Sequence, residues 1–153
     1  MRNYLVLIRK IDKGRFTKRQ IEYWLGVKRN GTNANRAPWT LSDFDDVYHS
    51  HSAIPDSVDE CFVADCVTHC ATESQPQFFV ITFTTKRLVK LHGKSTIFHA
   101  DGTYKTNRAG HPLIVTGVTD KARKFHPTSV SIANGETQQH FEVAFQSVKL
   151  AFK

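Results

Sequence analysis

The sequence has few cysteines and prolines and no long hydrophobic run. Its 153 residues include 3 Cys, 5 Pro and 1 Met. Three cysteines are an odd number for a disulfide framework, so we expect free thiols in a reducing compartment, the cytosol or the nucleus. The longest apolar runs, 4–8 and 78–83, are far shorter than the roughly 20 residues that cross a membrane. The first run is also shorter than the apolar core of about 7–15 residues in a signal peptide, so we expect neither membrane insertion nor secretion.

Acidic residues are also scarce, with 14 Asp and Glu against 21 Lys and Arg and a formal net charge of +7. A basic chain is typical of proteins that bind phosphate groups, because each Lys or Arg near a phosphate releases a counterion. Many soluble proteins are equally basic for solubility alone, so charge leaves both interpretations open. The hydrophobic fraction of 40%, with 11 Phe, excludes an intrinsically disordered or collagen-like chain. The length is typical of a single domain.

The N-terminal third is expected to be helical. Apolar residues recur every three or four positions over 18–28, which predicts a short helix. The turn-rich stretch 29–38 cannot continue it, and a second helical pattern begins after Thr40 and extends to residue 48. A connector containing a proline follows, so residues 1–58 are interpreted as a helical N-terminal extension.

Beyond residue 60 the pattern changes to short runs of aromatic and β-branched residues, which predict strands. These runs are 62–64, 78–83, 95–99, 113–118 and 128–132. The last three are separated by turns and are expected to form an antiparallel meander. A short helix is expected over 84–92, so residues 59–94 are interpreted as a connecting strand and helix segment.

The clearest helical pattern follows Asn134 and Gly135. Glu136 places a negative charge at the expected first turn, and apolar residues recur at i, i+3, i+4 and i+7. They are Phe141, Ala144, Phe145 and Val148. This helix is expected to continue to the last residue.

Asp101 directly follows the run 95–100, where a strand is expected to end. A carboxylate presented at the end of a strand is suited to bind a divalent metal. The alternative is an Asp that ends the strand by accepting hydrogen bonds from backbone amides in a turn.

The wider sequence around Asp101 resembles the start of a Mutator-like element (MULE) transposase domain. Residues 101–105 read Asp-Gly-Thr-Tyr-Lys, 117–120 read Gly-Val-Thr-Asp, 125–127 read Phe-His-Pro and 136–137 read Glu-Thr. In that family an Asp-x-Thr-Tyr-Lys motif ends the first strand, a Gly-x-x-Asp motif ends the second, and a Glu-Thr pair opens the first helix. The resemblance in order and spacing extends over about residues 78–153.

The resemblance implies an α/β (α+β) fold of the ribonuclease H-like type. Residues 95–153 would be the N-terminal half of that domain, truncated after three antiparallel strands and the first helix and preceded by the small helical segment. The first strand is central in the complete fold, so truncation is expected to leave it with an unpaired, apolar edge.

The resemblance also implies DDE chemistry, in which three carboxylates hold Mg²⁺ or Mn²⁺ for DNA cleavage and strand transfer. Asp101 corresponds to the first carboxylate and therefore to both a catalytic and a metal-binding residue. The other two lie downstream in the family, and Asp120 and Glu136 are expected to be structural instead. We therefore expect this chain to bind no metal tightly and to be inactive alone.

Basic residues around the expected sheet are interpreted as nonspecific phosphate contacts to transposon-end DNA, or as a solvated rim. They are Lys86, Arg87, Lys105, Arg108, Lys121, Arg123 and Lys124. The resemblance further implies the nucleus and leaves room for a homo-oligomer of the full-length protein. Two rival interpretations are a domesticated or remnant non-catalytic module that binds nucleic acid or a partner, and an ordinary small α/β domain with an incidental Asp101.

A cluster of soft ligands precedes the second strand run. It comprises Cys61, Cys66, His69 and Cys70, with His49 and His51 upstream. The spacing lacks a Cys-x2-Cys pair and a second paired cluster, so no zinc site is assigned. A free Cys in a strand commonly packs as a small hydrophobic residue, which is the interpretation for Cys61 and Cys66.

Overall fold

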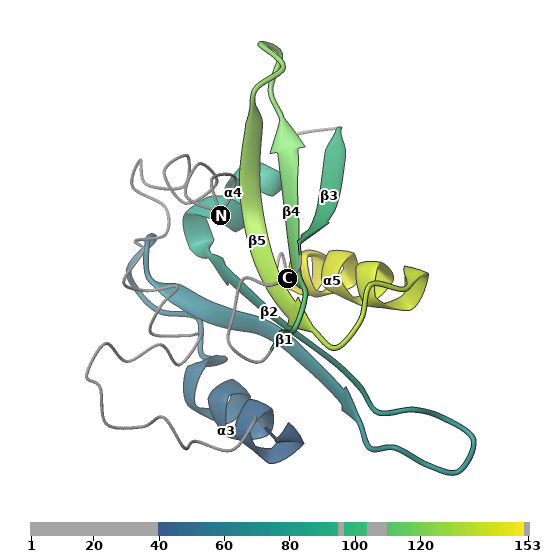
Figure 1. Cartoon of the computed structure of the whole chain (residues 1–153). Coiled ribbons are helices and arrows are strands. Elements are labelled where there is room, and N and C mark those ends of the chain that lie inside the picture. Colours follow the sequence, from purple (N-terminus) through teal and green to yellow (C-terminus); the bar gives the residue numbers. More distant parts are fainter. Residues whose placement is uncertain (1–39, 95–96, 104–109, 152–153) are drawn as a thin grey trace, which may run out of the picture.

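A five-stranded antiparallel sheet forms the centre of the structure (Figure 1). The structure is a computed structural model that describes residues 40–94, 97–103 and 110–151. The strand order is β1-β2-β5-β4-β3. The elements are α3 (Leu41–His51), β1 (Cys61–His69), β2 (Phe78–Thr85), α4 (Lys86–His92), β3 (Phe98–Thr103), β4 (Leu113–Thr119), β5 (Phe125–Ala133) and α5 (Gln138–Leu150).

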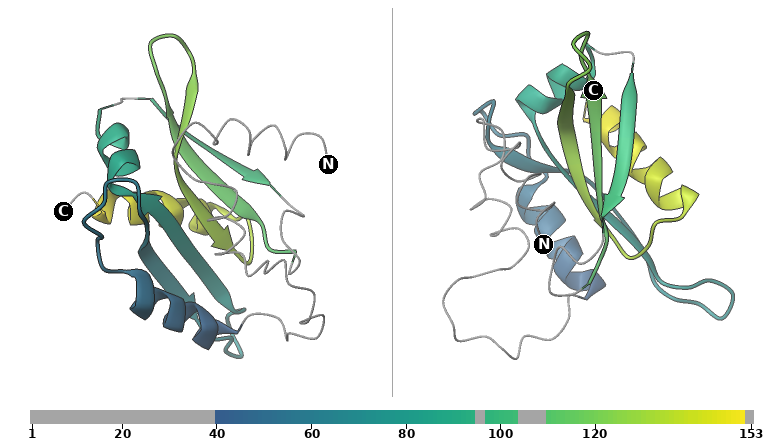
Figure 2. Two further views of the ribbon diagram at one scale, coloured as in Figure 1. Left: turned by 90° about the vertical axis from the view of Figure 1, so that its left-hand side faces the viewer. Right: turned by 45° about the horizontal axis from the view of Figure 1, so that its top comes forward.

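Helices α3 and α5 cover opposite faces of the sheet (Figure 2). Strand β2 shows the division, because successive side chains of a strand point to opposite faces. Phe79 and Ile81 pack in the cluster that contains Phe44 of α3, whereas Phe78 and Val80 pack with Ala144 of α5. All eight residues of β2 are buried, as a near-continuous apolar run predicts for a strand covered on both faces.

Helix α3 begins where the sequence places a capping residue. Thr40 accepts a hydrogen bond from the backbone of Asp43, and the Asp43 carboxylate bonds back to the Thr40 N–H. Phe44, 2% exposed, stacks on Phe79 with ring centroids 4.3 Å apart. This aromatic pair fixes α3 to the sheet. The helix expected over 18–28 lies outside the described residues.

The face that α5 covers is partly polar. The Thr82 and Ser131 hydroxyl oxygens lie 2.8 Å apart, and those of Thr116 and Ser129 lie 2.5 Å apart. All four residues are 0% exposed. Because each hydroxyl has a partner on the neighbouring strand, burying these polar groups leaves them satisfied.

The expected meander is present, since β5, β4 and β3 pair in order, but the sheet is larger than three strands. Strands β1 and β2 extend it beyond β5, through pairs such as Val80 with Ala133. Residues 59–94, interpreted as a connecting strand and helix segment, contribute β1 and β2 to the same sheet. Partners 53 residues apart in sequence (133 − 80) leave no local pattern from which their pairing could be predicted.

Strand β3 is at the sheet edge and lies farther along the chain than expected. It spans Phe98–Thr103 instead of 95–99, and it pairs with β4 alone among the described residues. Ile97 is 54% exposed and Phe98 is 45% exposed. In the described part of the chain, the outer edge of this strand is therefore unpaired, and its start is apolar. Within the described residues, no helix is long and apolar enough to cross a membrane.

Candidate functional site

Asp101 lies inside β3, opposite Val115 of β4. The expectation that it follows the end of the strand was wrong, because β3 continues through Gly102 and Thr103. Facing residues of an antiparallel pair share one side of the sheet. Gly102 faces Ile114, which packs with α5, so Asp101 lies on the opposite side of the sheet from α5.

The Asp101 side chain is exposed and has no hydrogen bond or ion pair within the described residues. In the same part of the chain, no three His, Cys, Asp or Glu side chains are grouped so that they could hold a metal ion. A two-metal centre needs several carboxylates, so the described residues do not fit one by themselves. What the structure presents is one accessible oxygen ligand on an edge strand.

Asp120 organises the turn between β4 and β5. Its Oδ1 accepts a hydrogen bond of 2.8 Å from the Lys124 N–H, and its Oδ2 lies 2.7 Å from Nε2 of His126. The hydrogen bond with His126 and that from the Lys124 backbone lower the pKa of Asp120. Arg123 has a φ of 59° in this turn. The expected structural role of Asp120 agrees with these contacts.

Glu136 lies just before α5, whose N-cap is Thr137. Its Oε1 atom is buried and has no hydrogen-bond partner in the described structure. A Cβ atom placed on Gly102 would be 2.7 Å from the Glu136 Cδ atom, so the carboxylate lies directly on β3. Apart from the Glu-Thr pair of the resemblance, no sequence pattern indicated this contact.

The predicted DNA-binding residues fall into separate groups. Lys86 and Arg87 begin α4, and both contact the loop between α3 and β1. The Lys86 Nζ donates to the Asp56 carbonyl at 3.2 Å, and Arg87 forms two hydrogen bonds with the Asp59 carboxylate. A second group is exposed on the turn at the end of the β4–β5 hairpin (Figure 1). That group is Lys121, Arg123 and Lys124. Lys105 and Arg108 lie outside the described residues.

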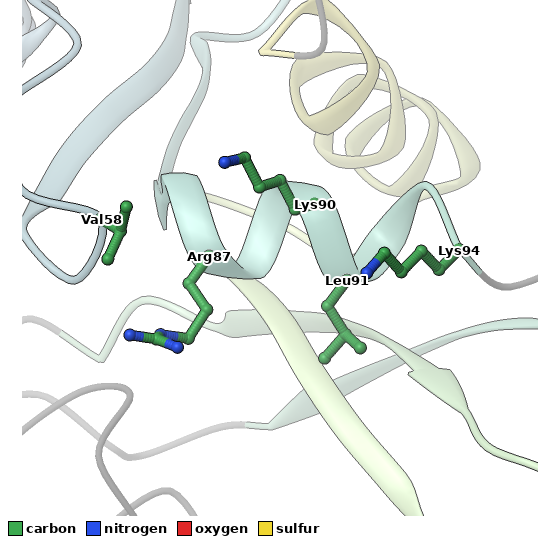
Figure 3. Close-up of a pocket in the computed structure, with 5 residues that line it drawn as sticks. All are labelled: Val58, Arg87, Lys90, Leu91 and Lys94. Carbon is green, nitrogen blue, oxygen red and sulfur yellow. The ribbon is translucent and has the colours of Figure 1, made fainter.

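A groove lies beside α4 that the sequence did not predict (Figure 3). Its volume is about 310 Å³. We call it the α4 groove, and it is lined by Val58, Arg87, Lys90, Leu91 and Lys94. The signal that could have found it is the spacing of Arg87 and Leu91, four residues apart on one side of a short helix, with Lys94 just beyond the C-cap.

The cysteines are thiols in different surroundings. Cys61 is buried in the α3 cluster and Cys66 packs against it, and burial raises the pKa of each to about 12. Such thiols remain protonated near neutral pH, whereas zinc binds the thiolate. Cys70 is exposed. The interpretation of Cys61 and Cys66 as small hydrophobic residues agrees with this packing.

A family model for the MULE transposase domain matches residues 97–153. This segment contains β3, β4, β5 and α5, and therefore Asp101. No curated protein matches the chain, and no solved structure matches its fold. Residues 97–153 therefore carry MULE transposase domain sequence, which confirms the family that the motifs indicated and supports a transposase-related function.

Proposed function

We propose that this chain contains the first part of a DDE-type DNA transposase domain with a ribonuclease H-like fold. The observation that carries the proposal is the family match over residues 97–153, which coincides with three antiparallel strands followed by a helix. These are the elements that the resemblance implies for the N-terminal half of the domain.

In this proposal Asp101 is the first metal-binding carboxylate. Asp101 is exposed on an edge strand, and Mg²⁺ and Mn²⁺ prefer carboxylate ligands. The resemblance places the other two carboxylates downstream of α5. We therefore infer that residues 1–153 alone neither bind these metals tightly nor cleave DNA.

DNA is the proposed partner and the nucleus the proposed location. The support for DNA is the net charge of +7 together with the exposed basic turn of the β4–β5 hairpin. Contacts of Lys121, Arg123 and Lys124 with phosphates would hold DNA without reading its sequence. A homo-oligomer is proposed for a full-length protein only.

The test is a plasmid-nicking assay with Mn²⁺ on two proteins: residues 1–153, and the chain extended by any open reading frame downstream of codon 153. We expect no nicking by the first, and nicking by the second that Asp101→Asn abolishes. The matched control is Asp46→Asn, which removes one exposed carboxylate from α3. Nicking that survives Asp101→Asn overturns the assigned role, and nicking by residues 1–153 overturns the inferred inactivity.

The second candidate is a non-catalytic module that binds nucleic acid or a partner. The observation that favours it concerns Asp101, which belongs to no group of three or more His, Cys, Asp or Glu side chains that could hold a metal ion among the described residues. A stop codon after residue 153 in the transcript, together with DNA binding by the chain, would support this candidate. A continuing frame whose product nicks DNA through Asp101 would exclude it.

A further inference from the structure

We propose that the α4 groove binds the sugar–phosphate backbone of a nucleic acid, with Lys90 and Lys94 as its phosphate contacts. The proposal rests on the proposed function only in taking a nucleic acid as the partner. It adds a binding surface that is distinct from Asp101 and from the basic turn of the β4–β5 hairpin.

Helix α4 forms one side of the groove, and its first residues are held in place by hydrogen bonds and burial. The Arg87 backbone N–H donates to the Val58 carbonyl at 3.0 Å, and Leu88 is 0% exposed. The Arg87 guanidinium donates to both oxygens of Asp59, at 2.5 Å and 2.7 Å. These hydrogen bonds join α4, on one side of the groove, to the loop before β1, on the other side.

The unbalanced positive charge lies at the other end of the helix. Arg87 is paired with Asp59, whereas Lys90 and Lys94 are exposed and have no ion pair within the described residues. No acidic residue occurs in α4. Lys90 is in the last turn of α4 and Lys94 follows the Gly93 C-cap, and both side chains line the groove. Two cations in one groove suit a polyanion better than a single carboxylate.

The lining is apolar between the charges. Val58 is 41% exposed and Leu91 is half-buried, and both face the groove beside the lysines (Figure 3). A nucleic-acid strand alternates an anionic phosphate with a largely apolar sugar, which matches this combination. An acidic peptide would meet the same lysines but would present carboxylates on longer side chains.

Helix α4, which lines the groove, also contacts the strand that carries Asp101. His92, in the last turn of α4, stacks on Phe98 at the start of β3, with ring centroids 4.5 Å apart. The His92 Nδ1 atom is also 3.0 Å from the Thr128 hydroxyl oxygen of β5. A backbone bound in the groove would thus lie on a helix that packs directly on the sheet containing the proposed catalytic strand.

The test is fluorescence anisotropy of a labelled DNA duplex with residues 1–153 at several NaCl concentrations. Each phosphate contact contributes about 0.9 to the slope of log affinity against log salt. We expect Lys90→Ala and Lys94→Ala each to lower that slope by about this amount and to weaken binding. Val58→Ser is expected to weaken binding with the slope unchanged. The matched control is Lys149→Ala, an exposed lysine of α5, for which neither quantity should change.

Circular dichroism and thermal melts establish that each variant is folded, which exposed substitutions should preserve. If Lys90→Ala and Lys94→Ala bind DNA as tightly as the Lys149→Ala control, the proposed role of the groove is wrong, although DNA can still be the partner. If the unaltered chain binds no DNA, the proposed role of the groove is also wrong. The nicking assay on Asp101→Asn tests the proposed function independently of this result. A poly-glutamate peptide that binds more tightly than DNA, with the same sensitivity to Lys90 and Lys94, would assign the groove to an acidic protein instead.

Discussion

The Glu136 carboxylate packs against the Cα atom of Gly102, the residue that follows Asp101. A Cβ atom at position 102 would lie 2.3 Å from Glu136 Oε1 and 2.7 Å from its Cδ. Real Cβ atoms essentially never approach other heavy atoms this closely, so a side chain at position 102 would require the Glu136 carboxylate to move. The segment before α5 and the strand carrying the candidate site are therefore held in contact at this point.

Gly102→Ala should destabilise the protein by about 1–3 kcal/mol, because the added methyl group forces the buried carboxylate or the strand to move. The free energy of unfolding, measured in urea, tests this. The cost should shrink in a Glu136→Ala background, where the carboxylate is absent. A double-mutant cycle gives the coupling between the two positions. Equal costs of Gly102→Ala in both backgrounds would contradict the contact.

The three cysteines should differ in their reactivity toward iodoacetamide. Cys70 is exposed, whereas burial raises the pKa of Cys61 and Cys66 to about 12. The thiolate is the reactive form, so in the folded protein Cys70 should be alkylated first and the other two only on unfolding. Mass spectrometry of digested samples provides the measurement, and alkylation in 8 M urea the control. Rapid labelling of Cys61 in the native protein would refute the described packing.

Local sequence patterns predicted the elements that depend on interactions between residues close together in the sequence. The helix that begins after Thr40, the short helix α4, the turn at Asp120 and the amphipathic α5 all agree with the structure. Each depends on residues within a few positions of one another. The start of α5 differs slightly, since Thr137 and not Asn134-Gly135 caps it.

Features that depend on long-range contacts were not predictable. The pairing of β2 with β5 joins residues 53 apart (133 − 80), and the contact of Glu136 with Gly102 joins residues 34 apart (136 − 102). Strand β3 was misplaced for another reason: an exposed edge strand has no alternating burial, so the apolar run before it gave a stronger signal than the strand itself. The family resemblance singled out Asp101 as a candidate site residue, and its role stays a prediction.

Phe44→Ala should cost about 3–5 kcal/mol, the usual range for truncating a buried aromatic side chain. Phe44 is 2% exposed and stacks on Phe79, so its removal opens a cavity between α3 and the sheet. The change in the free energy of unfolding is the measurement. Leu150→Ala is the control, because Leu150 is 52% exposed and its truncation should change stability by no more than about 0.5 kcal/mol. Similar effects of the two variants would mean that α3 contributes little to the core.

Three histidines should make the fold sensitive to mild acid. Burial lowers the pKa of His92, His111 and His140 in the folded protein. His140 shows the physical reason most clearly: its Nδ1 accepts a hydrogen bond from the Thr137 N–H, and its Nε2 lies 3.0 Å from the Asn134 side-chain oxygen. A protonated ring could not accept the first of these bonds.

The direction of the pH effect on stability follows from the number of protons that the folded and unfolded states bind. Unfolded histidines take up protons near pH 6.5, whereas the folded ones do so only at lower pH. Below about pH 6.5 the unfolded state therefore binds more protons, so the stabilisation is complete above that pH and decreases as pH falls. Urea unfolding at pH 7.5 and pH 5.5 should show this loss, and His140→Gln should reduce the difference between the two values. Replacement of the exposed His49 serves as the control. Stability that is unchanged or higher at pH 5.5 would contradict the buried, neutral state of these rings.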